Sequence, residues 1–320
     1  MMKSKEGAVV LEQQTGMGLR RVSFDQIKCK VRQYFKQLMP YGMVLPAMAI
    51  LGLFVLYPIF YMIYLSFFKW NLIGSKAFVG LHNFIRLFSD KAFWEVLGNS
   101  FQYMFFTVFF AIVLAIILAV YLKRETKANK LLQSILFTPH IVSLISITFV
   151  WMWLMDSNYG FLNYLLSILG LPAMGWLTDS NTALYSLILI SVWKSIGYNT
   201  LILISAMQAV PKYLYEAASL DNATKWTSFF KITLPMISPT LFFLTLMNMI
   251  AAFKVFEPVK IMTQGGPMNA TNTLVYDIYQ YGFTFYKIGY ASALGVVLMI
   301  IIGICTILYF AGLSHRVHYR

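Results

Sequence analysis

Polar side chains that could handle a solute gather on one face of a long apolar segment. Ser191, Lys194, Ser195 and Tyr198 follow the spacing i, i+3, i+4 and i+7, which places them on a single stripe of a helix. Hydroxyl, ammonium and phenol groups bind polar solutes by hydrogen bonding, and an aromatic ring can stack on a sugar ring, as Trp193 also could. The stripe therefore favours a solute pathway.

Lys194 is the unusual member of this stripe. It lies 11 residues after Ala183, or about 16 Å into the segment at about 1.5 Å per residue. An ammonium near the middle of a bilayer costs at least about 2.5–3.5 kcal/mol unless it faces water, a partner or the bundle interior. Lys194 either lines the pathway, or binds helix carbonyls, or lies at a subunit interface.

A second apolar segment carries Thr245, Asn248 and Ala252 at i, i+3 and i+7. An Asn in mid-membrane is costly unless it is hydrogen-bonded. Asn248 therefore either contacts the solute or joins two helices, and the spacing does not choose between these roles.

Residues suited to catalysis do not form a cluster in the sequence. Lys254 and Glu257 are predicted to form an ion pair at the membrane interface, and His140, after Pro139, is expected at a kink. The sequence has no H-E-x-x-H zinc motif and no G-x-x-x-x-G-K-[ST] phosphate loop. We predict that the chain is not an enzyme, holds no metal and binds no cofactor itself.

The composition shows which elements must position these residues. Of 320 residues, 59% are hydrophobic and 12% are charged, against about 25% charged in soluble domains. This excludes an ordinary soluble enzyme or a disordered chain. The net charge is +13, and the basic residues lie between long apolar runs. This placement indicates that they set the membrane topology, so no nucleic-acid partner is predicted. Cys29 and Cys305 are not expected to pair.

Six runs are long enough to cross a bilayer as helices, which needs about 20 apolar residues each. The sequence thus predicts an all-α membrane protein with a transmembrane domain over residues 41–313, a cytoplasmic tail over 1–40 and another over 314–320. The predicted spans are Met43–Ser66, Phe101–Leu122, Ser134–Met155, Ala183–Met207, Ser238–Pro258 and Tyr290–Leu313.

Positive charge sets the orientation. The tails and the even-numbered loops hold 17 Lys and Arg residues, and the other side holds 6, so both termini are predicted to be cytoplasmic. The outer loop Asp156–Thr182 has none, and Phe161–Leu169 within it suggests a surface helix. Apolar residues at helical spacing over 27–38 indicate an amphipathic helix on the inner membrane face, with a disordered basic tail as the alternative.

The cytoplasmic loop over 208–237 is the most informative segment. It is predicted to form a helix from Pro211, a left-handed turn at Asn222 and a second helix over Thr224–Ile232, stopped by Leu234-Pro235. Such a helix–turn–helix is typical of a docking handle for a cytoplasmic partner, although a surface loop without a partner is the simpler interpretation.

This loop, EAASLDNATKWTSFFKITLP, resembles the EAA loop of permease subunits in binding-protein-dependent ABC importers. Glu216, Ala217, Ala218, Ile232 and Leu234-Pro235 are in register with the family pattern, and Asn222 stands where the family has Gly. Segments such as FVGLHNFIRLFSD, SVWKSIGYNTLIL and TQGGP resemble the carbohydrate-uptake branch, in the first of its two permease subunits. The resemblance covers about residues 45–310.

The resemblance implies a type I importer fold in a bacterial cell membrane, surrounded by lipid. The implied partners are a second permease, two ATPase subunits that bind ATP and Mg, and an extracellular solute-binding protein delivering a carbohydrate. The alternatives are a non-carbohydrate solute such as glycerol phosphate, or an ion-coupled secondary transporter. The implied ATPase-coupling residues are Glu216, Ala217, Ala218, Leu220 and Asn222. The implied pathway residues are Ser191, Lys194, Ser195, Tyr198, Asn248 and Ala252.

Overall fold

A computed structural model describes residues 39–313 of the chain, with side chains to 312. The predicted amphipathic helix over 27–38 and the tail over 314–320 lie outside this range. The chain divides into two compact units at Ile59 and Phe60, a boundary inside the predicted first span. The first unit is helical over its described part, and everything below concerns the second unit.

The described residues are almost entirely helical, as the composition predicted. A two-stranded antiparallel hairpin, with Phe68 opposite Phe78, is the sheet that the described residues contain. Several helical segments are π-turns (η), in which each hydrogen bond spans five residues. In chain order the elements are η1 Gly52–Leu56, α2 Tyr57–Ser66, β1 Phe68–Lys69, β2 Ala77–Phe78, α3 His82–Ser89, α4 Lys91–Leu122, α5 Lys127–Ile141, α6 Leu144–Leu154, α7 Phe161–Ile168, α8 Ala183–Gln208, α9 Lys212–Leu220, α10 Lys225–Ser228, η2 Phe229–Thr233, α11 Leu234–Met236, α12 Ser238–Phe253, η3 Val259–Thr263, α13 Leu274–Tyr279, η4 Gln280–Thr284 and α14 Ile288–Leu313.

Within residues 39–313, four continuous helices are long and apolar enough to cross a membrane, and the number rises to six if each of two bent helix pairs is one span. The continuous ones are Met39–Ser66, α4, α8 and α14. The bent ones are α5 with α6, at 102°, and Lys225–Met236 with α12, at 67°. Each of the six predicted segments overlaps one of these, but the third is broken, and the bend of the second pair lies just before Ser238, where the fifth predicted segment begins.

The third segment breaks at Val142 and Ser143. Pro139 lies inside α5, and Val142 and Ser143 then take extended ψ angles of 141° and 133° before α6 begins. A proline in a helix removes one backbone hydrogen bond and favours a kink or an end nearby. The prediction of a continuous span from Ser134 to Met155 was wrong for this reason.

The fifth segment ends earlier than predicted, at Phe253 instead of Pro258. The amides of Lys254 and Val255 turn back onto Ala251 and Ala252 with tight three-residue bonds, which close the helix. Lys254 and Glu257 therefore do not share a helix, and the ion pair predicted between them is absent. The ion pair found within residues 39–313 joins Lys130 and Glu125 at 3.8 Å.

The centre of the second unit is α4, which packs against α8 and α12, while α5 packs against α8. The contact between α5 and α8 is very close at Gly197, where an added Cβ would overlap the backbone carbonyl of Leu136. Small residues allow membrane helices to approach in this way. Gly197 therefore sets the distance at which residues of α8 face the end of α5.

The loop Asp156–Thr182 contains α7, whose bounds Phe161–Ile168 agree closely with the surface helix predicted over Phe161–Leu169. Asn163 of α7 organises it: its amide nitrogen donates to the carbonyls of Ser157 and Met174, at 3.1 and 3.0 Å. Its carbonyl oxygen accepts from Met174 N and Trp176 Nε1, at 3.0 and 2.9 Å. One buried side chain thus holds the fold of this loop.

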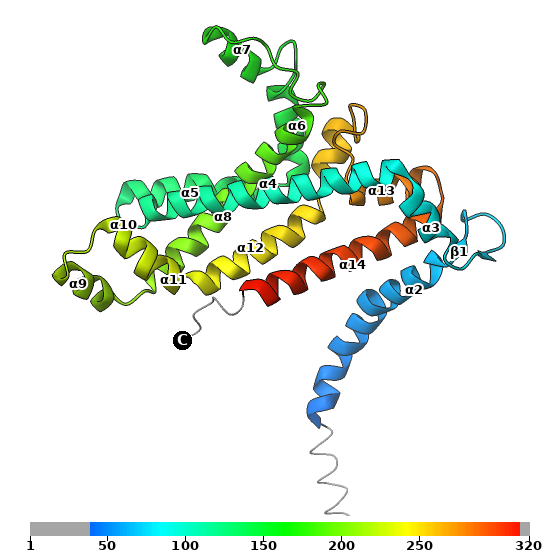
Figure 1. The fold of residues 1–320 in the computed structure, drawn as a ribbon, viewed down its shortest axis with the longest axis horizontal. Coiled ribbons are helices and arrows are strands. Elements are labelled where there is room, and N and C mark those ends of the chain that lie inside the picture. The colour runs from blue at the N-terminus through cyan, green and yellow to red at the C-terminus, as the bar shows by residue number, and fades with distance from the viewer. Residues whose placement is uncertain (1–38, 314–320) are drawn as a thin grey trace, which may run out of the picture. The chain divides into compact units, whose positions relative to one another are not determined.

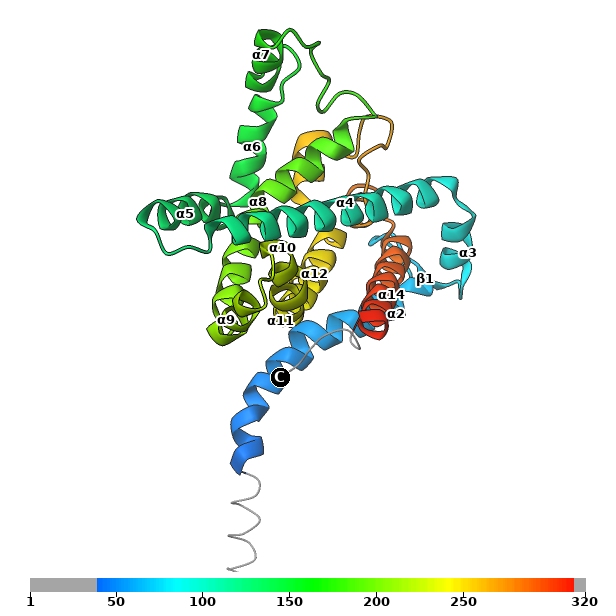
Figure 2. The ribbon, with the colours of Figure 1, turned by 60° about the vertical axis from the view of Figure 1, so that its left-hand side comes forward.

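Figures 1 and 2 show where the segments with functional potential lie in the second unit. In Figure 1 α9 and α10 lie at one end, and α3 with the β1 hairpin lies at the opposite end. In Figure 2 α9 and α3 are again well separated. The helices α4, α12 and α14 run between these ends. This arrangement is consistent with the predicted topology, in which α9 is cytoplasmic and the hairpin is external.

Candidate functional site

The loop between α8 and α12 forms the predicted helix–turn–helix. In α9, Glu216 and Ala217 are exposed, and Leu220 is 84% exposed. A largely exposed apolar side chain next to an exposed carboxylate is typical of a surface that contacts another protein. Ala218 differs, because it is buried on the opposite face of α9. Its side chain packs within this chain, although the sequence placed it with the coupling residues.

Asn222 has the left-handed conformation that the sequence predicted, with φ of 55°. The Ala223 amide donates to the Ala218 carbonyl at 2.9 Å, which closes the end of α9. Asn tolerates this conformation better than most residues after Gly. The turn expected of the family pattern is therefore made without glycine.

The second helix of the loop runs further than predicted. It starts with Thr224, whose hydroxyl accepts from the Thr227 amide at 3.2 Å, but it continues through η2 and α11 to Met236. In the π-turn, Leu234 N–H bonds to Phe229 O. The wider π-turn already lacks one i to i+4 backbone hydrogen bond of an α-helix. Pro235, which has no N–H to donate, therefore does not end the helix.

Tyr215 anchors α9 to the rest of the chain, a role that the sequence did not reveal. Its hydroxyl lies 2.9 Å from the Thr233 hydroxyl of η2. Its ring lies under the ammonium of Lys123, with 5.8 Å from Nζ to the ring centroid. Tyr215 thus joins both arms of the loop to the turn between α4 and α5.

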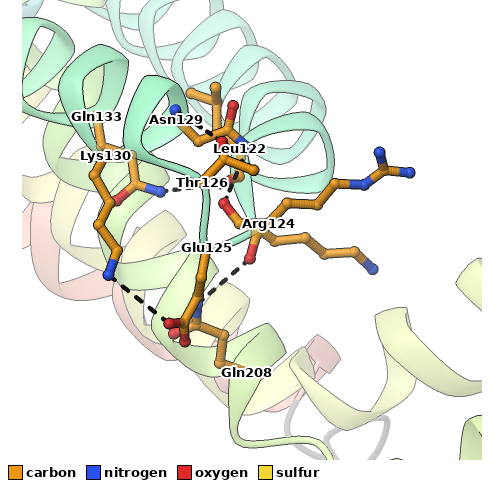
Figure 3. Close-up of polar contacts among 9 residues, drawn as sticks. Leu122, Arg124, Glu125, Thr126, Asn129, Lys130, Gln133 and Gln208 are labelled. Atoms are coloured by element: carbon orange, nitrogen blue, oxygen red, sulfur yellow. Dashed lines mark hydrogen bonds and ion pairs between the residues drawn. The ribbon is translucent and has the colours of Figure 1, made fainter.

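That turn is itself tightly organised, as Figure 3 shows. The Thr126 hydroxyl caps α5 by accepting from Asn129 N at 3.2 Å, and Gln133 Nε2 donates to Leu122 O at 2.9 Å. Gln208, the last residue of α8, reaches Lys123 O at 3.5 Å. The ends of α4, α5 and α8 are thereby connected where the loop over 208–237 begins. We call this segment the coupling loop, after the role that the resemblance implies for it.

Lys194 of α8 is a helix cap in this structure. Its Nζ donates to the carbonyls of Val142, Pro139 and His140 at 2.7, 3.1 and 3.4 Å. These are carbonyls that the end of α5 leaves without helical partners, and a cation is favoured at a helix C-terminus. Of the roles the sequence left open, binding to helix carbonyls is the one observed.

The two serines of the stripe also bond within the chain. The Ser191 hydroxyl pairs with the buried Tyr103 hydroxyl of α4, and the Ser195 hydroxyl donates to Val192 O of its own helix at 3.2 Å. Both side chains are half-buried. Ser191 therefore contributes to the packing of α4 on α8.

Asn248 joins two helices. Its amide nitrogen donates to Asn199 Oδ1 at 3.0 Å and to Leu244 O at 2.8 Å, and Asn199 Nδ2 donates back to Asn248 Oδ1 at 3.2 Å. Asn199 is buried on α8, one position beyond the predicted stripe. Ala252 is buried in the core around α4, α8 and α12. In this conformation Ala252 is thus a packing residue and not an exposed lining of a pathway.

Tyr198 is the most open member of the stripe, at 38% exposed. Its ring stacks on the His140 imidazole, with centroids 4.5 Å apart and planes at 12°. Nearby, Trp193 of α8 and Trp151 of α6 line a groove of about 520 Å³ in the bend between α5 and α6. Apart from Thr138 and Ser146, the residues lining that groove are apolar.

His140 contacts aromatic rings in this structure. Within residues 39–313, no group of three or more His, Cys, Asp or Glu residues could hold a metal ion. The imidazole instead stacks between Phe137 and Tyr198, at centroid distances of 5.6 and 4.5 Å. The site thus offers hydrogen-bonding and stacking groups around a helix break, and a separate exposed loop.

Comparison with known proteins agrees with this geometry. Residues 111–319 match the family described as binding-protein-dependent transport system inner membrane component. The probable ABC transporter permease protein YurN of Bacillus subtilis (strain 168) is 36% identical over 83% of this chain and 92% of its own length. The sn-glycerol-3-phosphate transport system permease protein UgpA of Yersinia pestis bv. Antiqua (strain Antiqua) is 33% identical over 88% and 96%.

Solved structures show the same fold. A bacterial ABC transporter involved in the import of the acidic polysaccharide alginate matches with a TM-score of 0.78 and 23% identity, over 91% of this chain and 100% of that one. The alginate transporter was also solved with an alginate pentasaccharide-bound periplasmic protein, and that chain matches with a TM-score of 0.77. The chain belongs to the family of inner membrane components of binding-protein-dependent transport systems and is an ABC importer permease subunit, not an enzyme.

Proposed function

We propose that this permease carries a carbohydrate across the membrane, driven by ATPase subunits that dock on α9. The exposed surface of Glu216, Ala217 and Leu220 on an anchored helix is the observation that carries the proposal. ATP and Mg belong to the ATPases, and this chain transmits their motion through Tyr215 and the joined ends of α4, α5 and α8.

The carbohydrate assignment rests on relatives and on charge. The alginate importer handles an acidic polysaccharide, which supports a carbohydrate, whereas UgpA is named for sn-glycerol 3-phosphate, the non-carbohydrate alternative. Lys194, the cation in the middle of α8, donates to three backbone carbonyls. This supports a neutral sugar over a phosphate ester. Tyr198, exposed and aromatic, is the residue of the stripe best placed to stack on a sugar ring.

In this proposal the present chain forms one side of the transport pathway, and its partners form the rest. A second, homologous permease would face the exposed surfaces of α8 and α12, and a solute-binding protein would deliver the sugar to the outer loops, including Asp156–Thr182. Both termini are cytoplasmic in this proposal. The family match gives no support to an ion-coupled secondary transporter.

Cysteine labelling tests the topology on which the proposal depends. In a variant lacking Cys29 and Cys305, Leu220→Cys should react with a membrane-impermeant maleimide in inside-out vesicles and not in intact cells. Tyr159→Cys, 87% exposed in the opposite loop, is the matched control and should react in intact cells. Labelling of the Leu220→Cys variant from outside would refute docking of an ATPase on α9.

Reconstitution tests the substrate. The assembled importer, with its binding protein, should take up a neutral sugar in an ATP-dependent manner, and excess glycerol phosphate should not compete. Tyr198→Ala should raise the KM for the sugar several-fold, because the stacking of one aromatic ring typically contributes about 1 kcal/mol of binding free energy. Unchanged affinity in Tyr198→Ala would argue against its place in the pathway, and uptake without ATP would argue against the whole mechanism.

A further inference from the structure

A small basic pocket lies at the end of the second unit opposite the coupling loop. Its volume is about 140 Å³, and three cationic side chains line it: Lys69, Arg86 and Lys287. No carboxylate belongs to the lining, which otherwise consists of Trp70, Asn71, His82, Asn83, Gly289 and Tyr290. Three like charges around one small space repel one another, and a bound anion would relieve that repulsion.

The pocket is rigidly built. Asn83, a buried residue of α3, donates to the carbonyls of Ser66 and Phe68 at 2.8 and 3.0 Å, which ties α3 to the hairpin. Gly289 lets the start of α14 touch the same strand, because an added Cβ would overlap Phe68 O. Arg86 is held over the Tyr290 ring at 5.2 Å. The cationic side chains therefore surround a pocket whose backbone segments, from the hairpin, α3 and α14, are held in contact with one another.

Two helices begin at this pocket. His82 is the first residue of α3, which has eight residues, and Gly289 is the second residue of α14, which has 26. Helix N-termini carry partial positive charge and attract anions. Together with the three cationic side chains, they give the pocket an electrostatic preference for a negatively charged group.

Helix α3, beside the pocket, has the exposure pattern of a helix that lies at a membrane interface. Its exposed face is apolar: Leu81, Ile85 and Phe88 are 60%, 63% and 49% exposed at i, i+4 and i+7. His82 and Arg86 occupy the neighbouring face, and Asn83 and Leu87 are buried. A helix with one apolar and one basic exposed face lies in the membrane interface. Tyr290, which also lines the pocket, lies near the start of α14, one of the helices long and apolar enough to cross a membrane.

We propose that this pocket binds the phosphate headgroup of an anionic phospholipid in the outer leaflet. The volume is below the range of about 300–1,000 Å³ usual for drug-sized ligands and leaves room for a few water-sized groups of about 30 Å³ each. A headgroup enters from the membrane side, where the exposed apolar face of α3 contacts acyl chains. The bound lipid would hold the hairpin, α3 and the start of α14 together.

Native mass spectrometry of the assembled importer tests this assignment. Delipidated complex is titrated with phosphatidylglycerol, with phosphatidylcholine and, separately, with inorganic phosphate. The double variant Arg86→Gln/Lys287→Gln is compared with Lys91→Gln/Lys260→Gln, which removes two cations outside the pocket on the same predicted side. Since each basic residue near an anionic lipid surface is worth about 1 kcal/mol, the pocket variant should bind the tightest phosphatidylglycerol about thirtyfold more weakly, and the control should bind like wild type.

Each arm of the experiment decides one point. Equal affinity of the pocket variant and the control would overturn the site. Equal binding of phosphatidylglycerol and phosphatidylcholine by wild type, a measurement that needs no variant, would overturn the preference for an anionic lipid. Displacement of the lipid by millimolar inorganic phosphate would identify the occupant as a free anion and refute the lipid assignment.

Discussion

The coupling loop and the mid-membrane stripe use their polar residues in opposite ways. On α9, Glu216 and Ala217 are exposed and lie on an anchored helix. On α8, Lys194 and Ser191 direct their polar atoms to α5 and α4. In water an exposed carboxylate costs little, whereas in a bilayer an unpaired polar group costs several kcal/mol. The comparison indicates that α9 is built for contact and the stripe largely for cohesion.

The largest effect is expected at the coupling loop. Glu216→Lys should abolish ATP-dependent uptake, because it reverses the charge of a surface proposed to dock the ATPase. It should leave the free energy of unfolding of the solubilised chain within about 0.5 kcal/mol of wild type. Uptake and ATPase activity in proteoliposomes measure this. Asp221→Lys, an exposed reversal five residues away, is the control and should retain uptake. Normal uptake by Glu216→Lys would remove the contrast between the two regions.

Gly197→Ala tests whether cohesion depends on close helix approach. The added Cβ overlaps the Leu136 carbonyl, so we expect a loss of about 1–3 kcal/mol in stability, the usual cost of overpacking. Thermal unfolding in detergent followed by tryptophan fluorescence measures the loss. At Gly303 of α14 an added Cβ meets no described atom within 4 Å, so Gly303→Ala should be neutral or stabilising. Equal melting temperatures for the two variants would contradict the packing argument.

Lys194→Met distinguishes a cap from a solute contact. Removing the ammonium leaves the carbonyls at the end of α5 without their donor, at a cost of about 1.5–3 kcal/mol for charged hydrogen bonds. We expect a lower melting temperature and fewer assembled complexes, with unchanged sugar selectivity. Ser195→Ala, which loses one bond within its own helix, should have a much smaller effect. A changed KM at an unchanged melting temperature would instead support a pathway role for Lys194.

The Asn199–Asn248 pair should show direct coupling. A double-mutant cycle with Asn199→Leu and Asn248→Leu is expected to give about 0.6 kcal/mol, the average measured for hydrogen bonds between membrane helices, and at most about 1.7 kcal/mol. Asn199→Leu combined with Ser205→Ala, whose hydroxyl bonds to Leu201 O of its own helix, should be additive within about 0.3–0.5 kcal/mol. Additivity of the Asn pair itself would show that the bond contributes no stability.

The smallest effect concerns pH and lies outside both regions. Burial raises the pKa of Asp277 to about 6, partly offset by the Asn272 amide. A raised carboxyl pKa favours folding below the unfolded value near 3.8, and this contribution is lost as the pH rises through about 6. Asp277→Asn should therefore raise the melting temperature by a few degrees at pH 7.5 and have little effect at pH 4. A similar gain for exposed Asp221→Asn would contradict this explanation.

Much of the fold was predictable from local signals. Long apolar runs located the six segments, and charge asymmetry gave an orientation. The EAA pattern located the coupling loop, and the left-handed Asn222 was expected from its residue type alone. These features depend on residues near each other in the sequence. The sequence also indicated a kink at His140 and a separation before Ser238, but not that the third segment breaks into two helices at 102°, because the effect of a proline depends on what receives the freed carbonyls.

The sequence by itself determined that this chain spans a membrane and predicted the helix–turn–helix between α8 and α12, since hydropathy and short motifs suffice for both. Only the tertiary structure decided which polar residues serve cohesion. Lys194 meets Val142, and Asn199 meets Asn248, across about 50 positions. Such pairings follow from helix distance and rotation, which depend on close contacts such as that at Gly197. Spacing within one helix defines a face, but the neighbouring helix decides what that face does.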